Sequence, residues 1–237
     1  MERESGKVIL KRITAVLMAV IMLLCVAPLE SIEELNFSVF DSSAYDDEFG
    51  LILNEGEIWI DGYYGSEENV VIPSEFDDYE GYVVTKIADS AFQGETKIKS
   101  VTIPEGVNYI GRYAFEDCIS LETVNVPDSV NRIRKDAFNN TAWYDAQPDG
   151  IVYAGKVAYA YKGEMPENTS VVLKDGTTGV SDEAFANCSN LVKFESPSSV
   201  TDFDENVFSN CTNLKEMIIN GNVFRADLTE AEKCTKL

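Results

Sequence analysis

The stretch IKSVTIPEGVNYIGRYAFEDC, residues 98–118, is followed closely by LETVNVPDSVNRIRKDAFNN, residues 121–140, which has the same plan. Each segment starts with an alternating apolar pattern, reaches a proline at Pro104 or Pro127, and then places two spaced aliphatic residues before an Ala-Phe pair. Residues 191–211 follow this plan once more, with Val in place of Ala. Self-similarity at a fixed spacing is the signature of a repeat architecture.

The period of the repeat is 23 residues. The first residues of the Ala-Phe pairs are Ala91, Ala114, Ala137, Ala184 and Val207, so the intervals are 23, 23, 47 and 23 residues. The long interval corresponds to two repeats plus one residue, and the period therefore survives an interruption. A 23-residue period lies in the range of leucine-rich repeats, whose short coils bury their apolar faces only by stacking on one another. The sequence predicts a solenoid with one β-strand and one short helical turn per coil.

The side chains of one coil have predictable directions. Leu121, Val124 and Val126 alternate with Thr123 and Asn125, so the first group faces inward and the second faces solvent, as on a strand. A proline ends the strand because it lacks the N–H that a β-ladder needs. The phenylalanine of each Ala-Phe pair is expected in the shared core, where these rings form a phenylalanine stack of Phe92, Phe115, Phe138, Phe185 and Phe208.

Two hairpins are expected in the repeat domain, which we place at residues 49–220. Residues 49–63 alternate on both sides of Asn54-Glu55-Gly56, and this hairpin is expected to cap the first coil. A second hairpin, turning at Ala154-Gly155-Lys156, is inserted at about residues 141–168. The acidic segment 28–48 is expected to be a linker, and residues 221–237 a C-terminal tail.

The first 27 residues have the pattern of a secretory signal peptide. Arg3, Lys7, Lys11 and Arg12 precede an uncharged apolar run over residues 13–27. This run is shorter than the roughly 18 residues that a membrane-spanning helix needs, so we expect no membrane span after cleavage. The sequence therefore predicts a secreted or cell-surface protein.

The charge of the chain disfavours one class of partner. Residues 1–27 hold two of the 41 acidic and four of the 19 basic residues, which leaves 39 and 15 after cleavage, a net charge of −24. Such a surface repels phosphate backbones, so nucleic-acid binding is not expected. It attracts basic partners, although simple solvation of an acidic exterior explains the same composition.

The repeat resembles the BspA-like leucine-rich repeat proteins of host-associated bacteria. The resemblance covers residues 49–220 and rests on Ile-Pro-x-x-Val-x-x-Ile-x-x-x-Ala-Phe-x-x-Cys, as in residues 103–118, and on the insert from Trp143 to Tyr159. It implies a curved right-handed solenoid that is secreted or surface-displayed, with adhesion to matrix proteins or cells known for some members. It implies no catalytic residues. The chain departs from larger relatives in having no recognisable anchoring module.

The composition argues against catalysis. The chain contains no histidine, which removes the commonest general base and excludes Ser-His-Asp and Cys-His mechanisms. Pairs of carboxylates remain, but none stands out by position. Asp202-x-Asp204-x-Asn206 imitates the start of a calcium loop, yet Val207 and Asn213 replace the Gly and Glu that the loop requires. We expect no catalytic residue, no cofactor and no metal.

Three cysteines share one position of the repeat. Cys118, Cys188 and Cys211 each lie three residues after the phenylalanine, which favours a structural role as a small apolar side chain over a redox or metal cluster. Cys188 and Cys211 lie on neighbouring coils, so the sequence leaves open whether they pair. Cys234 lies outside the repeat.

Two surfaces are candidates for binding. The outward strand positions form a ladder whose members are mostly small and polar: Asn69, Ser100, Thr102, Thr123, Asn125, Ser170, Lys193, Glu195 and Glu216. The insert supplies an aromatic group: Trp143, Tyr144, Tyr153, Tyr159 and Tyr161. The alternatives are solvation of the ladder and packing of the aromatic residues onto the coils.

These observations predict a monomeric, non-catalytic binding or adhesion module. The expected partner is an extracellular protein or a matrix or cell-surface ligand, with a glycan among the alternatives. Two other functions stay open, a structural spacer without a specific ligand and a carbohydrate-binding protein.

Overall fold

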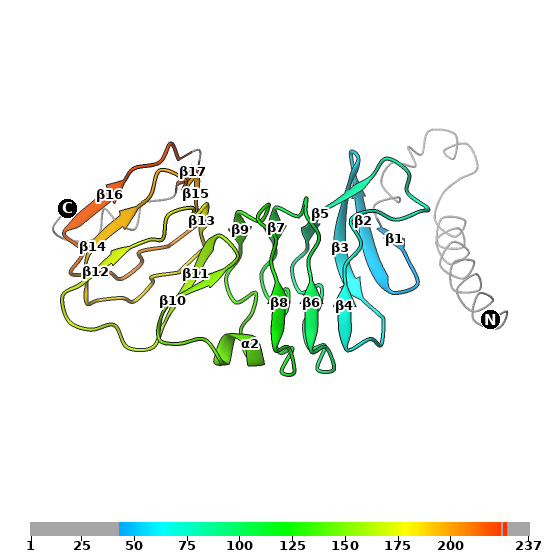
Figure 1. Ribbon diagram of the computed structural model, residues 1–237, viewed down its shortest axis with the longest axis horizontal. Helices are drawn as coiled ribbons and strands as arrows, with labels where there is room; N and C mark the ends of the chain where they lie inside the picture. The colour runs from blue at the N-terminus through cyan, green and yellow to red at the C-terminus, as the bar shows by residue number, and fades with distance from the viewer. Residues whose placement is uncertain (1–42, 224, 227–237) are drawn as a thin grey trace, which may run out of the picture.

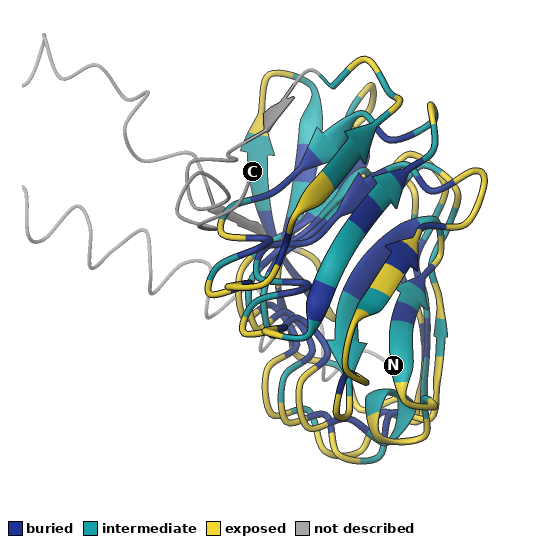
Figure 2. Ribbon diagram, turned by 90° about the vertical axis from the view of Figure 1, so that its left-hand side faces the viewer, coloured by how far each residue is buried: buried dark blue, intermediate teal, exposed yellow. Residues whose placement is uncertain are grey.

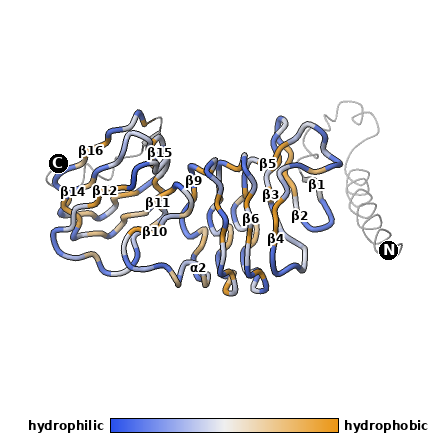
Figure 3. The backbone as a smooth tube through the Cα atoms, in the orientation of Figure 1, coloured by the Kyte–Doolittle hydropathy of each residue, from blue (hydrophilic) through white to orange (hydrophobic). Residues whose placement is uncertain are grey.

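The computed structural model describes residues 43–223 and 225–226. The predicted signal peptide, most of the predicted linker and most of the C-terminal tail lie outside these residues. The described chain forms an elongated β-solenoid (Figure 1). Hydrophobic segments recur from coil to coil along it (Figure 3), and exposed residues gather at the turns (Figure 2).

The first strand of each coil contributes to one of two three-stranded parallel sheets. The strands of these sheets are β4 (Asn69–Val71), β6 (Ser100–Thr102) and β8 (Thr123–Asn125), and then β12 (Thr169–Val172), β14 (Leu191–Ser196) and β16 (Glu216–Ile219). Neighbouring strands pair in the register that the repeat predicts, with Ser100 opposite Thr123 and Lys193 opposite Glu216.

The opposite side of the solenoid carries the two larger sheets. The six-stranded sheet contains β1 (Ser43–Tyr45), β2 (Phe49–Asn54), β3 (Glu57–Tyr63), β5 (Val83–Ile87), β7 (Tyr109–Ile110) and β9 (Arg132–Ile133). The five-stranded sheet contains β10 (Gly150–Ala154), β11 (Val157–Lys162), β13 (Gly179–Val180), β15 (Asp202–Phe203) and β17 (Arg225–Ala226). Strands β1 and β17 extend these sheets beyond residues 49–220.

The solenoid consists of two modules with the same plan. We call residues 43–140 the N-terminal module and residues 150–226 the C-terminal module. In each, an antiparallel hairpin is followed by strands that pair in parallel, β3 with β5 and β11 with β13. Tyr63 of the first hairpin stacks on Phe92, and Tyr161 of the second contacts Phe185 in the equivalent place. Both predicted hairpins are thus present, and each begins a stack of coils.

The phenylalanine stack is present and buried, as predicted. The rings of Phe92 and Phe115 stack with centroids 4.8 Å apart, those of Phe115 and Phe138 at 5.4 Å, and those of Phe185 and Phe208 at 6.0 Å. All five phenylalanines are at most 2% exposed. Between Phe138 and Phe185 the stack is interrupted, and Tyr159 of the second hairpin contacts Phe138 there.

The predicted helical turn around each phenylalanine is instead a run of hydrogen-bonded turns. Asp136 and Asn140 have φ values of 58° and 54°, which a right-handed helix does not allow. The N–H of Phe115 donates to the carbonyl of Ala137 in the next coil at 2.8 Å, so coil stacking uses the donor that a helix would need internally. The one helix within the described residues is α2 (Ala142–Asp145), which Thr141 caps.

Candidate functional site

The predicted ladder lies on the two three-stranded sheets rather than on one continuous face. Its positions on β4, β6 and β8 pair across strands, and so do those on β12, β14 and β16. The insert, with α2 and β10, lies between the two sheets (Figure 1). The sequence could not show this separation because the period continues across the interruption.

Many polar groups of the ladder bond to one another. The Ser100 hydroxyl donates to Asn69 Oδ1 at 2.7 Å, and Asn125 Nδ2 donates to Thr102 Oγ1 at 3.2 Å. Lys193 Nζ lies 3.0 Å from a Glu216 carboxylate oxygen. These exposed contacts hold the side chains in a flat array on a rigid sheet. Whether the array binds a partner stays a prediction.

The aromatic residues of the insert pack between the modules. Tyr159 is 6% exposed, its hydroxyl accepts the N–H of Phe138 at 3.0 Å, and burial raises its pKa. The Trp143 ring lies 4.9 Å from that of Phe138, and Tyr144 meets Tyr159 edge-on at 5.9 Å. These three side chains close the core of the N-terminal module.

The other two predicted aromatic residues face the second core. Tyr153 and Tyr161 are partly buried and pack against the hydrophobic core of the C-terminal module. The Tyr153 hydroxyl accepts the N–H of Lys174 at 3.1 Å, and Lys174 Nζ lies 4.2 Å from the ring centroid. The five residues therefore do not form one exposed aromatic patch, and the alternative of packing onto the coils describes their positions.

A network of ion pairs joins the two modules. Arg134 bridges Asp204 at 2.6 Å and Asp182 at 3.3 Å, while Arg132 contacts Asp204 at 3.0 Å and Arg112 contacts Asp182 at 3.2 Å. The side chains of Asp182, Asp204 and Arg134 are 2%, 1% and 8% exposed. Buried pairs of this kind are costly to break because the remaining partner is left as an uncompensated charge.

Asp182 has a perturbed titration in this network. Burial raises its pKa to about 6, an effect that the guanidinium of Arg134 opposes and the carboxylate of Asp204 reinforces. Its Oδ1 atom has no hydrogen-bond partner among the described residues. The Asp182 carboxyl therefore takes up a proton at a pH well above that of an ordinary aspartate.

A row of aromatic and cationic side chains crosses the six-stranded sheet. Trp59, Lys86, Tyr109 and Arg132 face one another on β3, β5, β7 and β9. Lys86 Nζ lies 4.0 Å from the Trp59 ring centroid, and the Arg132 guanidinium carbon lies 5.4 Å from that of Tyr109. The four residues line a shallow depression of about 450 Å³. We call this set the aromatic–cation row.

Sequence reasoning missed this row although a signal was present. Lys86, Tyr109 and Arg132 are 23 residues apart, so each holds the same position in successive coils. The residues of the predicted ladder all lie on the first strand of each coil, whereas these three lie on the second. Applying the same period to the second strand would have found three of the four members.

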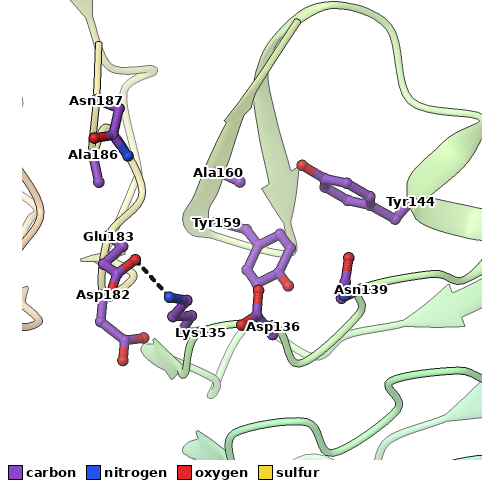
Figure 4. A pocket seen from close by; sticks show the side chains of 10 residues that line it. All are labelled: Lys135, Asp136, Asn139, Tyr144, Tyr159, Ala160, Asp182, Glu183, Ala186 and Asn187. Carbon is purple, nitrogen blue, oxygen red and sulfur yellow. Dashed lines mark ion pairs between the residues drawn. The ribbon is translucent and has the colours of Figure 1, made fainter.

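A smaller hollow lies at the junction of the modules (Figure 4). Its volume is about 190 Å³, and residues of β11, of α2 and of the turns after β9 and β13 line it: Lys135, Asp136, Asn139, Tyr144, Tyr159, Ala160, Asp182, Glu183, Ala186 and Asn187. Lys135 and Glu183 form an ion pair at 2.7 Å across one side.

The cysteines of the repeat are structural. Cys118 and Cys188 are buried free thiols, so Cys188 does not pair with Cys211, which is buried as well. Cys118 Sγ donates to the carbonyl of Phe92 and Cys211 Sγ to that of Phe185, at 3.0 and 3.1 Å. Burial raises the pKa of Cys118 to about 12 and that of Cys188 to about 11, so these thiols stay protonated and unreactive at neutral pH. Cys234 lies outside the described residues.

The described residues hold neither a metal-binding cluster nor a helix of the membrane-spanning type. No group of three or more His, Cys, Asp or Glu side chains there is placed to hold a metal ion. The segment that imitates a calcium loop begins in β15, and Asp204 bonds to Arg132 and Arg134 instead. The described part of the chain contains no helix with the length and apolar character of a membrane span.

The chain is similar to several solved leucine-rich repeat proteins. A search of curated proteins finds no match. Among solved structures, a leucine-rich repeat protein of T. pallidum is 23% identical, with 76% of this chain and 82% of that chain covered and a TM-score of 0.43. A leucine-rich repeat protein of Bacteroides ovatus is 30% identical over 73% of this chain and 46% of that one, with a TM-score of 0.44.

The sequence itself matches a described repeat region. Six copies of the BspA type leucine rich repeat region cover residues 79–146 and 157–237. These ranges include most of the coils of both modules and all five residues of the phenylalanine stack. The chain therefore belongs to the family of BspA-type leucine-rich repeat proteins.

Proposed function

We propose that this protein is a non-catalytic module that binds a protein partner outside the cell, either secreted or held at the surface. The predicted signal peptide supports the location, and the absence of histidine from the sequence supports a role without catalysis. The observation that carries the proposal is the aromatic–cation row.

The row has the composition of a protein-binding surface. Trp, Tyr and Arg are the residues most enriched among the side chains that dominate binding energy at interfaces. Trp59, Tyr109 and Arg132 are all partly exposed, and they line a depression on a rigid sheet. A rigid array loses little conformational entropy when a partner binds.

The arrangement of the row favours a protein over a glycan. A sugar ring binds an aromatic side chain by stacking on its face. In this row Lys86 lies over Trp59 and Arg132 lies over Tyr109, so one face of each ring is already covered. A carbohydrate ligand remains the second candidate because the notable aromatic content of the row also suits sugars.

Binding arrays test the proposal. Residues 28–237 are applied to arrays of extracellular matrix proteins and of glycans, and retained partners are measured again with two variants. We expect Lys86→Glu, which reverses a charge in the row, to weaken binding of a matrix protein at least tenfold. The matched variant on the polar ladder is Thr123→Arg.

The outcomes of the binding arrays distinguish between the candidate surfaces and between the candidate functions. Loss of binding with Thr123→Arg alone places the binding surface on the ladder and contradicts the proposed surface. Retention of glycans alone identifies a carbohydrate-binding protein. A chain that retains no partner at physiological salt behaves as a structural spacer and contradicts the proposed function.

A further inference from the structure

The hollow at the module junction exists because coil stacking is interrupted there. Within a module, the N–H of a core phenylalanine donates to the next coil, as Phe92 does to Ala114 and Phe185 does to Val207, at 2.8 and 3.0 Å. At the junction Phe138 N–H donates to the Tyr159 hydroxyl instead. The hairpin thus takes the place of a coil in the core but leaves a space between the turns after β9 and β13.

The carboxylates of this hollow are not all neutralised by neighbouring cations. Lys135 pairs with Glu183, and Arg112 and Arg134 bind Asp182 through Oδ2. The 2%-exposed Asp182 side chain keeps its Oδ1 without a hydrogen-bond partner. Asp136 forms no ion pair with any described residue, and burial raises its pKa. An incoming cation would compensate the Asp136 carboxylate.

The walls of the hollow match one kind of cation. Tyr159 stands beside Asp136 and Tyr144 lies farther along the wall, while Ala160 and Ala186 add small apolar groups (Figure 4). Aromatic rings attract organic cations and also tolerate the methylene groups that carry them. The volume of about 190 Å³ equals about six water molecules at roughly 30 Å³ each. It suits one side chain rather than a drug-sized ligand.

We propose that this hollow binds a primary alkylammonium group, such as the side chain of a lysine that a partner presents. Tyr144 and Tyr159 contact its methylene groups, and Asp136 receives the ammonium. The strongly acidic surface draws basic segments towards it. The site is separate from the aromatic–cation row, so it does not depend on the surface proposed above.

Titration with small probes tests the inference. The probe is a blocked lysine, Nα-acetyl-lysine N-methylamide, and its Nε-acetylated form is the uncharged control. The background variant is Trp59→Phe, because the chain has two tryptophans and Trp143 then reports alone from the residue next to Tyr144. We expect a saturable change of Trp143 fluorescence in the millimolar range with blocked lysine and none with the acetylated form.

A matched pair of variants separates the site from general charge attraction. Asp136→Asn and Asp145→Asn each remove one negative charge, but the exposed Asp145 does not line the hollow. Asn tolerates the left-handed backbone at position 136, where φ is 58°. We expect Asp136→Asn to weaken binding about fivefold or more and Asp145→Asn to change it less than twofold.

Further outcomes identify the source of the bound amine or contradict binding in the hollow. Saturable binding of 1,4-diaminobutane but not of blocked lysine would assign the hollow to free amines instead of a protein side chain. Absence of saturation with both probes, or equal effects of the two variants, would overturn the proposed site. A Lys86→Glu variant, which is expected to impair the proposed protein binding, should leave the probe titration unchanged.

Discussion

The two modules share their inward residues and differ in their outward ones. Both have a hairpin tyrosine over the first phenylalanine, Tyr63 over Phe92 and Tyr161 near Phe185. The outward row of the N-terminal module contains Lys86 and Tyr109, whereas the corresponding strands of the C-terminal module carry Gly179 and Asp202 in the same paired register. The repeat thus constrains the core and leaves the surface of each coil free to differ.

The difference at Gly179 has a structural reason. A Cβ atom at this position would overlap the carbonyl oxygen of Asn131 in the N-terminal module. Lys86 is thus partly exposed in the N-terminal module, whereas the equivalent position in the C-terminal module, Gly179, lies at the contact between the two modules. Strands β9 and β13 approach closely on this side, beside the ion pairs of Arg132 and Arg134 with Asp204.

The largest expected effect comes from removing a shared inward residue. Phe115→Ala opens a cavity in the stack between Phe92 and Phe138, and we expect it to lower the free energy of unfolding by roughly 3–5 kcal/mol. Denaturant unfolding followed by circular dichroism measures the change. An outward substitution in the same module, Thr123→Ala, serves as the control and should change it by less than about 0.5 kcal/mol. A Phe115→Ala protein as stable as the parent would contradict the stacking of coils.

A smaller effect is expected where the modules differ. Gly179→Ala forces a methyl group against the backbone of Asn131, and overpacking of this kind costs roughly 1–3 kcal/mol. Because Asn131 belongs to the other module, we also expect the junction to open, which small-angle scattering would detect as a longer particle. An unchanged unfolding curve together with an unchanged particle length would mean that the modules are not in contact at this point.

The smallest effect depends on pH and concerns the ion-pair network. Burial raises the pKa of Asp182 to about 6 in the folded protein, against roughly 3.9 in an unfolded chain. A raised carboxyl pKa contributes stability below the unfolded pKa, and this contribution is lost as the pH rises through 6. Asp182→Asn does not titrate, so its stability relative to the parent should rise by about 1–2 kcal/mol from pH 4 to pH 7.

Chemical unfolding at these two pH values measures the difference. The control is Asp145→Asn, since Asp145 is exposed on α2. Its stability relative to the parent should stay nearly constant over the same range. A relative stability of Asp182→Asn that falls with rising pH would mean that the arginines, not burial, dominate the titration of Asp182.

The fold was predictable because its determinants are periodic. The interval of 23 residues and the phenylalanines placed the coils, and the alternation around Asn54 and Ala154 placed both hairpins. The prediction of a helical turn was wrong because local propensity does not reveal that the N–H of Phe115 donates to the following coil. The family assignment from the repeat is confirmed.

The ion-pair network and the hollow were less predictable because they depend on contacts across the junction. Arg132 and Asp204 are 72 residues apart, and no repeat spacing relates them. The hollow likewise requires knowledge of where the second hairpin lies relative to Phe138. Binding by the polar ladder stays a prediction, as does the export that the first 27 residues indicate.

The Tyr159 hydroxyl bonded to Phe138 N–H has a consequence for how such chains lengthen. The second hairpin covers the end of the first stack of coils and starts the second stack. A whole unit of one hairpin plus its coils can therefore be duplicated or deleted without leaving the core of a coil uncovered. Growth by single coils needs no new hairpin but must preserve all 23 positions. A chain of this design can therefore change its length by two different steps, and only the larger step creates another junction.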